Sequence, residues 1–204
     1  MPRLSVGEDN GRGGGVNDGD PNTYPGSSVL KNRLGIRNAT EFEYREREFV
    51  MQRMREGPPS GDFDLAHLRA IHRHLFQDIY DWAGEVRTVE ISKGGHAFQF
   101  CRFIETGMAD VHRRLVATDR LRGLDAEAFA TGAGEITGDV NYVHPFREGN
   151  GRTQLQYLKQ LAARAGHPID LTRLDPRRWL DASIAAQGAD YAKMSLEIGR
   201  ALVR

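Results

Sequence analysis

The segment from His144 to Gln156, HPFREGNGRTQLQ, brings several kinds of reactive and anion-binding group into a short span. An imidazole, a carboxylate, two glycines, an amide and an arginine fall within its first nine residues, and an apolar-periodic stretch follows. A glycine-rich turn that leads into a helix presents unpaired backbone N–H groups and the positive end of the helix dipole to whatever lies in front of it. The segment therefore predicts an anion-binding loop at the start of a helix.

The side chains of this loop suit phosphate groups and a divalent cation. Gly149 and Gly151 allow close approach of the backbone. Asn150 and Arg152 can donate hydrogen bonds to phosphate oxygens, the arginine through its planar guanidinium. Glu148 offers the hard oxygen ligand that Mg²⁺ takes alongside substrate phosphates. We therefore expect a phosphorylated ligand and Mg²⁺ at this loop.

His144 has two interpretations. It is the one group of the segment whose ordinary pKa suits proton removal near neutral pH. Taken alone, it would be an ordinary histidine at the C-terminal end of a helix, where the dipole favours a positive charge. For this residue taken alone, the second interpretation is favoured.

Composition excludes several other classes of protein. The chain has 28 basic and 28 acidic residues, so we expect no general attraction to nucleic acid. Cys101 is the only cysteine, which excludes an internal disulfide and suits a reducing compartment; we interpret it as a small apolar filler. No apolar run reaches membrane-spanning length, and the N-terminus lacks an apolar signal core. We expect a cytoplasmic protein with no membrane partner.

The chain is expected to form one mainly α-helical domain over residues 21–204, after a disordered tail at 1–20. The tail is rich in glycine, Asp and Asn and has almost no apolar side chains to bury. Thr40 and Glu43 suggest a capping box, and small residues over 126–134 would permit close helix contact. Apolar spacing and capping signals predict helices over about 40–55, 64–82, 103–121 and 125–142, from the glycine turn to 165, from 175 to the glycine at 188, and over 189–203.

Two further patterns are weaker. His67, His72 and His74 lie on the second predicted helix, and we interpret them as partly exposed surface, because a metal site would need other ligands to converge there. Residues 87–91 alternate like a strand, Gly94-Gly95 suits a turn, and 97–100 could return as a second strand. A two-stranded hairpin is marginal alone and must lie on something, so these residues alone predict a connecting ribbon.

The loop resembles the Fic signature, His-x-Phe-x-Asp/Glu-Gly-Asn-Gly-Arg-x-x-Arg, and matches it from His144 to Arg152. The resemblance covers roughly residues 21–204 and includes Trp82-Ala83-Gly84, Arg87, Ile91 and Lys93. It implies the Fic fold, a helical bundle with a small β-hairpin flap over the active site. It also implies a protein adenylyltransferase, a nucleotidyltransferase that moves AMP from ATP to a Ser, Thr or Tyr hydroxyl of a target protein.

The resemblance also implies a role for each matching residue. His144 would be the general base, and Glu148 would hold Mg²⁺. The flap would hold the target backbone by strand addition through Ile91, Ser92 and Lys93. The residues implied to bind the nucleotide are Lys93, Gly94, Arg147, Gly149, Asn150, Gly151 and Arg152.

One position departs from the signature. The second arginine, which holds the γ-phosphate in the family, is Leu155 here. A charge-assisted contact of that kind contributes roughly 1.5–3 kcal/mol. Weak activity, a different nucleotide, or substitution by another basic residue such as Arg164 would each account for the change.

No clean inhibitory sequence, Ser/Thr-x-x-x-Glu-Gly/Asn, is present; 5–10 and 183–188 match it only imperfectly. The absence, together with the lead-in from Asp20 to Leu34, resembles bacterial Fic toxins whose inhibitory helix lies on a separate antitoxin. Targets in that group include subunits of gyrase and topoisomerase IV. The alternatives are transfer of phosphate or another nucleotide monophosphate, or a decayed nucleotide- or partner-binding module. A translocated effector needs more assumptions than a cytoplasmic toxin.

Overall fold

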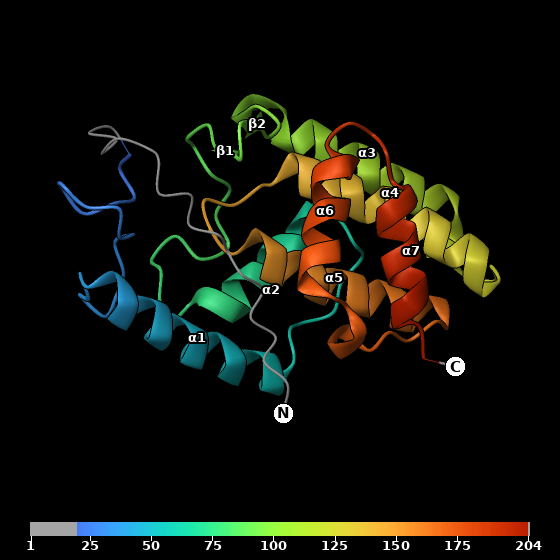
Figure 1. The fold of residues 1–204 in the computed structure, drawn as a ribbon, viewed down its shortest axis with the longest axis horizontal. Helices are drawn as coiled ribbons and strands as arrows, with labels where there is room; N and C mark the ends of the chain where they lie inside the picture. Colours follow the sequence, from blue (N-terminus) through green and yellow to red (C-terminus); the bar gives the residue numbers. More distant parts are fainter. Residues whose placement is uncertain (1–19, 204) are drawn as a thin grey trace.

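The computed structural model describes residues 20–203, and these form a mainly helical bundle with one small hairpin (Figure 1). The prediction of a mainly α fold with a hairpin is confirmed. Most of the predicted tail, residues 1–19, lies outside the described residues. The elements are α1 (Ala39–Glu56), α2 (Leu65–Phe76), β1 (Ser92–Lys93), β2 (His96–Ala97), α3 (Ile104–Ala117), α4 (Ala126–Val143), α5 (Asn150–Ala165), α6 (Pro176–Ala186) and α7 (Ala192–Ala201).

Helix starts follow the capping residues. Asp64, Asp125 and Asp175 each accept a hydrogen bond from a backbone N–H in the first turn of α2, α4 and α6. Gly166 follows α5 in the left-handed conformation, and the predicted helix end at 165 is confirmed. The predicted capping box of α1 is wrong. The cap is Asn38, whose side chain accepts from the N–H of Glu41, because an Asx side chain just ahead of the helix reaches its first turn directly.

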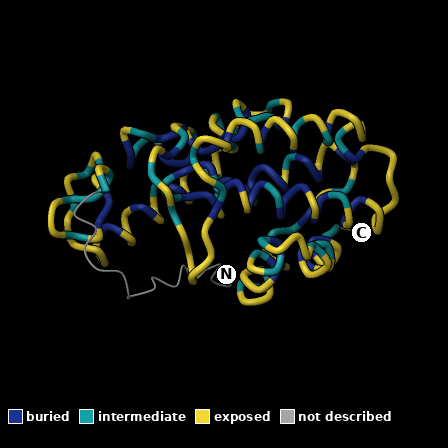
Figure 2. Tube along the Cα trace, turned by 90° about the horizontal axis from the view of Figure 1, so that it is seen from above, coloured by how far each residue is buried: buried dark blue, intermediate teal, exposed yellow. Residues whose placement is uncertain are grey.

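Helix α4 lies at the centre of the bundle and contacts α3, α5, α6 and α7. The buried stretches of the chain run through the interior of the molecule, and the exposed stretches lie around them (Figure 2). A Cβ added at Gly134 would lie 2.8 Å from the backbone nitrogen of Ser195, and one at Gly138 would lie 2.6 Å from the Tyr191 ring. The prediction that small residues allow close helix contact is confirmed for α4 against α7.

The predicted ends of two helices are wrong. Helix α2 stops at Phe76, not near Trp82, and α3 stops at Ala117, not at residue 121. After α2 the N–H groups of Ile79 and Tyr80 both bond to the Phe76 carbonyl, and both side chains remain buried although the regular helix has ended. Apolar spacing reports which side chains face the core, and it does not report whether the helical hydrogen-bond ladder continues.

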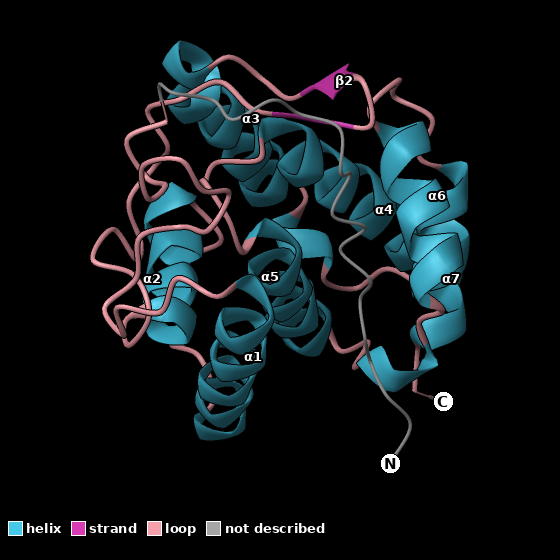
Figure 3. Cartoon of the chain, turned by 60° about the vertical axis from the view of Figure 1, so that its left-hand side comes forward, coloured by secondary structure: helices cyan, strands magenta, loops and turns pink. Residues whose placement is uncertain are grey.

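The hairpin is shorter than predicted. Strands β1 and β2 pair Ser92 with Ala97 and Lys93 with His96, and residues 87–90 form no strand. The N–H of Arg87 bonds instead to the carbonyl of Pro145, in the loop between α4 and α5. The hairpin lies at the opposite end of the molecule from α1 (Figure 3). Among the described residues, none of the helices combines the length and the apolar character needed to cross a bilayer.

Candidate active site

The loop between α4 and α5 carries the predicted site. His144 ends α4 in the left-handed region, with φ 46° and ψ 62°, and Gly149 precedes α5 with φ 79°. Helix α5 begins at Asn150, so its first N–H groups lie in the motif. The structure thus confirms a glycine turn at a helix start, flanked by the proposed base.

The ring of His144 is oriented from two sides. Its Nδ1 lies 3.0 Å from the carbonyl oxygen of Asn141, which can only accept, so Nδ1 carries the proton in the neutral ring. The lone pair is then on Nε2. The ring stacks on Phe98 of the flap segment, by which we mean residues 87–100, with centroids 3.6 Å apart. Burial lowers the pKa of His144 to about 4, so the ring is neutral near pH 7 and can accept a proton.

Asn150 and Phe146 hold the loop together. The Asn150 amide accepts from the Phe146 N–H at 2.9 Å and donates to the Phe146 carbonyl at 2.7 Å. Phe146 is fully buried, so it anchors the loop in the core. Because the amide of Asn150 is engaged at both ends, an anion would meet the backbone N–H of this residue more readily than its side chain.

Glu148 and Arg152 belong to a charged cluster at the start of α5. An oxygen of Glu148 accepts from the Gly149 N–H at 2.7 Å and lies 3.5 Å from Arg152. The guanidinium also contacts Glu46 of α1 at 3.2 Å, and Glu46 accepts from the Tyr80 hydroxyl at 2.7 Å. A single guanidinium between two carboxylates is fixed in direction, which suits a group that must meet phosphates at one position.

Sequence reasoning did not single out Glu46. A signal was available, since Glu46 lies between Phe42 and Val50 at helical spacing, on the stripe of α1 that the structure buries. A carboxylate on such a stripe requires a partner.

The two motif glycines differ in their surroundings. A Cβ added at Gly149 would lie 2.3 Å from the Phe76 ring, so this glycine packs on the core. A Cβ at Gly151 would meet nothing within 4 Å, so the space in front of it is open. Over residues 20–203 there is no group of three or more His, Cys, Asp or Glu that could hold a metal. Glu148 is part-exposed, and a single carboxylate of this kind fits a Mg²⁺ whose other ligands are phosphates and water.

Arg147 pairs with the start of the described chain. Its guanidinium contacts the Asp20 carboxylate at 2.8 Å from Nε and 2.6 Å from Nη2. The structure therefore engages Arg147, which the resemblance assigns to the nucleotide, in a part-buried ion pair that ties the lead-in segment to the loop.

Arg87 is a residue that the motif does not name and that links the flap segment to the loop. Its side chain is fully buried, and it donates to the carbonyls of His144 at 2.8 Å and Val89 at 2.9 Å. It also donates to the Gln99 carbonyl, and its own N–H bonds to Pro145. A buried arginine needs this many acceptors, and here they lie on both sides of the site.

The interpretation of the α2 histidines as surface residues is wrong for His67 and His72, which are both buried. His67 lies between the Phe63 N–H and the carbonyl of Pro59. His72 contacts the motif loop itself, with Nε2 3.0 Å from the Glu148 carbonyl. Burial statistics fail here because each ring is supplied with polar partners on both nitrogens.

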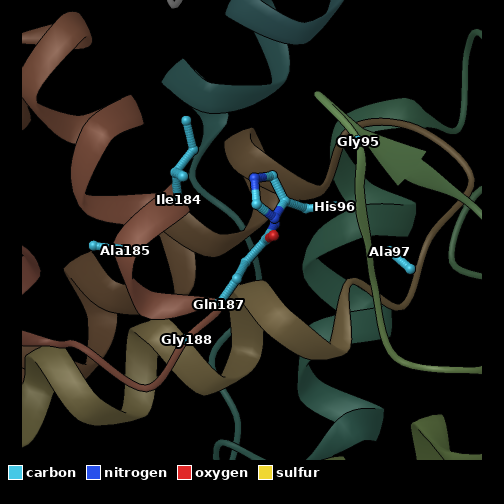
Figure 4. A pocket seen from close by; sticks show the side chains of 7 residues that line it. All are labelled: Gly95, His96, Ala97, Ile184, Ala185, Gln187 and Gly188. Atoms are coloured by element: carbon cyan, nitrogen blue, oxygen red, sulfur yellow. The ribbon is translucent and has the colours of Figure 1, made fainter.

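The flap residues have varied exposure. Ile91 is half-buried, whereas Ser92, Lys93 and Gly94 are exposed. The Lys93 charge is among the groups that lower the pKa of His144, after burial, so the flap and the base share one electrostatic environment. A cavity of about 410 Å³ separates the hairpin turn from the end of α6 (Figure 4). It is lined by Gly95, His96, Ala97, Ile184, Ala185, Gln187 and Gly188.

Leu155 is half-buried and packs against the core. Arg164, considered above as a substitute for the missing arginine, contacts Gly61 and Asp62. It follows Arg152 by 12 residues in α5, which is roughly 18 Å along a helix. Arg164 therefore lies too far along α5 to replace the missing contact.

Known proteins share this fold, and the family match includes the loop between α4 and α5. The sequence pattern of the whole Fic/DOC family, which is longer than the motif, matches residues 62–162. A Sinorhizobium fredii protein named "Probable protein adenylyltransferase y4lH" is 43% identical over 182 residues, which cover 89% of this chain and 95% of that protein. "Protein adenylyltransferase VbhT" of Bartonella schoenbuchensis is 40% identical over 90% of this chain, which spans 39% of that longer protein.

A solved structure agrees with the sequence relatives. The crystal structure of the BepC effector of Bartonella tribocorum, with bound AMPPNP, superposes with a TM-score of 0.80 at 26% identity. The match covers 89% of this chain and 96% of that one. Since a relative of 43% identity is covered almost end to end, and since the family signature spans α2 to α5, this chain belongs to the Fic/DOC family.

Proposed function

We propose that this chain, a nucleotidyltransferase of the Fic/DOC family, transfers AMP from ATP to a hydroxyl side chain of a target protein. The observation that carries the proposal is the neutral, oriented ring of His144 beside a glycine turn at the start of α5. A proton acceptor and a set of anion-binding N–H groups are the two requirements of such a transfer.

His144 acts as the base in this proposal. Nε2 takes the proton of the target Ser, Thr or Tyr hydroxyl as the hydroxyl oxygen forms a bond to the α-phosphorus of ATP. The bond between that phosphorus and the bridging oxygen breaks, and pyrophosphate leaves with the electron pair. The Nδ1–H bond to the Asn141 carbonyl holds the ring in the tautomer that this step needs.

The start of α5 neutralises and positions the phosphates. The N–H groups of Gly149, Asn150 and Gly151 and the guanidinium of Arg152 are the donors. Glu148 would hold Mg²⁺, which supplies charge neutralisation when bound. The Lys93 charge acts on His144, and Lys93 and Gly94 of the flap complete the nucleotide residues of the proposal.

The flap would hold the target. Ser92 and Lys93 are exposed and belong to a strand with one neighbour, so a target segment can add to the free edge through backbone hydrogen bonds. Ile91, Ser92 and Lys93 are the docking residues of this proposal. Strand addition makes few demands on the target sequence, which suits a loop presented by a folded protein.

We further propose a bacterial cytoplasmic toxin held inactive by a small antitoxin that supplies an inhibitory helix. The resemblance of the lead-in segment to such toxins supports this, as does the absence of a clean inhibitory sequence. Subunits of gyrase and topoisomerase IV are the proposed targets.

The deciding experiment compares the parent with His144→Ala in transfer of labelled AMP to protein in a bacterial lysate. The proposal expects labelling by the parent and a loss of at least about 100-fold in the variant, because general base catalysis contributes roughly 10²–10⁴-fold. Mass spectrometry of the labelled protein identifies the transferred group. Equal labelling by both proteins would show that His144 is not the base. If the parent binds nucleotide but transfers no AMP, the chain is a nucleotide-binding module and not an enzyme.

A further inference from the structure

His72 of α2 lies directly beneath the motif loop, although it is distant from it in sequence. Its ring is fully buried and stacks on Phe146 with centroids 4.0 Å apart. Its Nε2 lies 3.0 Å from the carbonyl oxygen of Glu148, and its Nδ1 lies 2.8 Å from the N–H of Gly84. The ring thus joins α2, the segment after it and the loop at one point.

The two hydrogen bonds fix the tautomer of this ring. A backbone carbonyl only accepts and a backbone N–H only donates, so Nε2 carries the proton and Nδ1 the lone pair. Burial lowers the pKa of His72 to about 4, which agrees with a neutral ring at pH 7. The N–H of Gly84 is buried, and without His72 as its acceptor it would have no hydrogen-bond partner.

The contact with Glu148 has a geometric consequence. In a trans peptide the carbonyl and the following N–H point in opposite directions. With the Glu148 carbonyl held on His72, the N–H of Gly149 must point away from His72, and it donates to the Glu148 carboxylate at 2.7 Å. One hydrogen bond from His72 therefore sets the direction of a proposed phosphate donor and, through it, the place of the proposed metal ligand.

We infer that His72 is a positioning residue that holds the Glu148–Gly149 peptide in the orientation the phosphates require. The inference rests on the proposed function, since it assigns His72 a part in that reaction through the loop and not through contact with substrate. A rotated peptide would present a carbonyl oxygen, which repels phosphate, where the N–H now points.

Three variants separate this role from packing. The side-chain amide of His72→Gln reaches about as far as Nε2 and can still donate to the Glu148 carbonyl. In His72→Asn the amide reaches only about as far as Nδ1, so it can satisfy Gly84 but not Glu148. Both lose the ring stacked on Phe146, whereas His72→Phe keeps a ring and loses both hydrogen bonds. Gln and Asn are thus a reciprocal pair, because Gln keeps the contact with Glu148 and Asn keeps the contact with Gly84.

The variants are compared in AMP transfer, in thermal unfolding temperature, and in the NMR signal of the ¹⁵N-labelled Gly149 amide. We expect His72→Gln to remain within about tenfold of the parent, and His72→Asn and His72→Phe to fall by about 100-fold, the cost of a small misplacement at a reacting centre. The Gly149 amide signal should stay near its parental position in the Gln variant and move in the other two.

The outcomes distinguish this inference from the proposed function. If the parent transfers no AMP, the proposed function fails, while the Gly149 signal still tests the positioning role. If the parent is active and the rates follow unfolding temperature alone, with the Gly149 signal in place in every variant, His72 serves packing and the inference is overturned. A Phe variant that is as active as the parent would overturn it even if the amide variants fail to fold.

Discussion

At the scale of single residues, alanine substitutions at Gly149 and Gly151 are expected to have opposite effects on stability, although the two glycines lie only two positions apart. An alanine at 149 would be strained, because φ is 79° there, and its Cβ would lie 2.3 Å from the Phe76 ring. We expect Gly149→Ala to lower the free energy of unfolding by about 2–4 kcal/mol from strain and overpacking together. Urea unfolding measures this loss.

Gly151→Ala is the control, because its Cβ meets nothing within 4 Å and the residue lies in a helix. Alanine is favoured over glycine there by up to about 1 kcal/mol, so this variant should be as stable as the parent or more so. Equal losses of unfolding free energy in both variants would show that the close contact of Gly149 with Phe76 is not what makes glycine necessary at position 149.

A second prediction concerns the pH dependence of the reaction. Burial lowers the pKa of His144 to about 4; Glu148 opposes this, whereas Arg87 and Lys93 add to it. A base whose folded pKa is lowered stays neutral and active until the pH falls through that value. The pH dependence of kcat/KM reports the pKa values of the free enzyme. We therefore expect kcat/KM to stay constant as the pH is lowered from 8 to about 5, and to fall only below pH 5. A bend near 6.5 would mean an unperturbed ring.

Leu155 gives a third prediction. Leu155→Arg restores the family arginine three residues after Arg152, at a half-buried position. The added charge-assisted contact, roughly 1.5–3 kcal/mol, should lower the KM for ATP by about tenfold or more. Leu155→Lys is the matched control, since it adds charge without the planar fork and should gain less. No gain from arginine would indicate that the γ-phosphate is already held by other groups.

How far single residues could be predicted depends on where their partners lie. The loop residues follow one another, so the sequence alone predicted that His144, Glu148 and Arg152 lie at one helix start. His72 was misread and Glu46 was missed, because their partners are distant in the chain. Spacing along one helix cannot show which loop comes to lie against it.

At the scale of elements, beginnings were predicted better than ends. A cap is a local hydrogen bond between a side chain and the next turn, so Asp64 and Asp125 could be identified from their positions alone. The end of α2 at Phe76 has no such signal, because buried residues continue through the turns that follow. The predicted hairpin was too long, because the backbone N–H and the side chain of Arg87 donate hydrogen bonds to carbonyls of the motif loop and not to a second strand.

The contact of α4 with α7 makes a prediction at this scale. A Cβ at Gly134 would lie 2.8 Å from the Ser195 nitrogen and 2.9 Å from its Cα, and backbone atoms cannot move without shifting α7. We expect Gly134→Ala to lower the free energy of unfolding by about 1–3 kcal/mol, despite the better helix propensity of alanine. In Gly199→Ala, the control on α7, the nearest atom is 3.7 Å away, so urea unfolding should show no loss. A stable Gly134→Ala would mean that the two helices can separate freely.

At the scale of the whole molecule, the site is assembled from distant parts of the chain. Glu46 comes from α1, His72 from α2, Arg87 from the flap segment, and His144 and Arg152 from the motif. The family resemblance predicted the helical bundle and its hairpin, whereas periodicity alone predicted only separate helices. Neither predicted that Glu46 and His72 contact the motif. A ligand that engages the loop therefore acts on contacts that join most of the bundle.

This coupling leads to the last prediction, which concerns stability in the presence of nucleotide. A ligand that binds the native state at 100 times its Kd adds about 2.7 kcal/mol to the free energy of unfolding. For a domain of this size each kcal/mol raises Tm by about 2–4 °C, so saturating ATP with Mg²⁺ should raise Tm by about 5–10 °C. Scanning fluorimetry with ATP, with and without Mg²⁺, measures the shift. Glu148→Gln keeps the side-chain shape and loses the charge, so its Tm shift with ATP should depend less on Mg²⁺ than that of the parent. An undiminished Mg²⁺ dependence in Glu148→Gln would place the metal on other ligands and leave Glu148 as the acceptor for the Gly149 N–H.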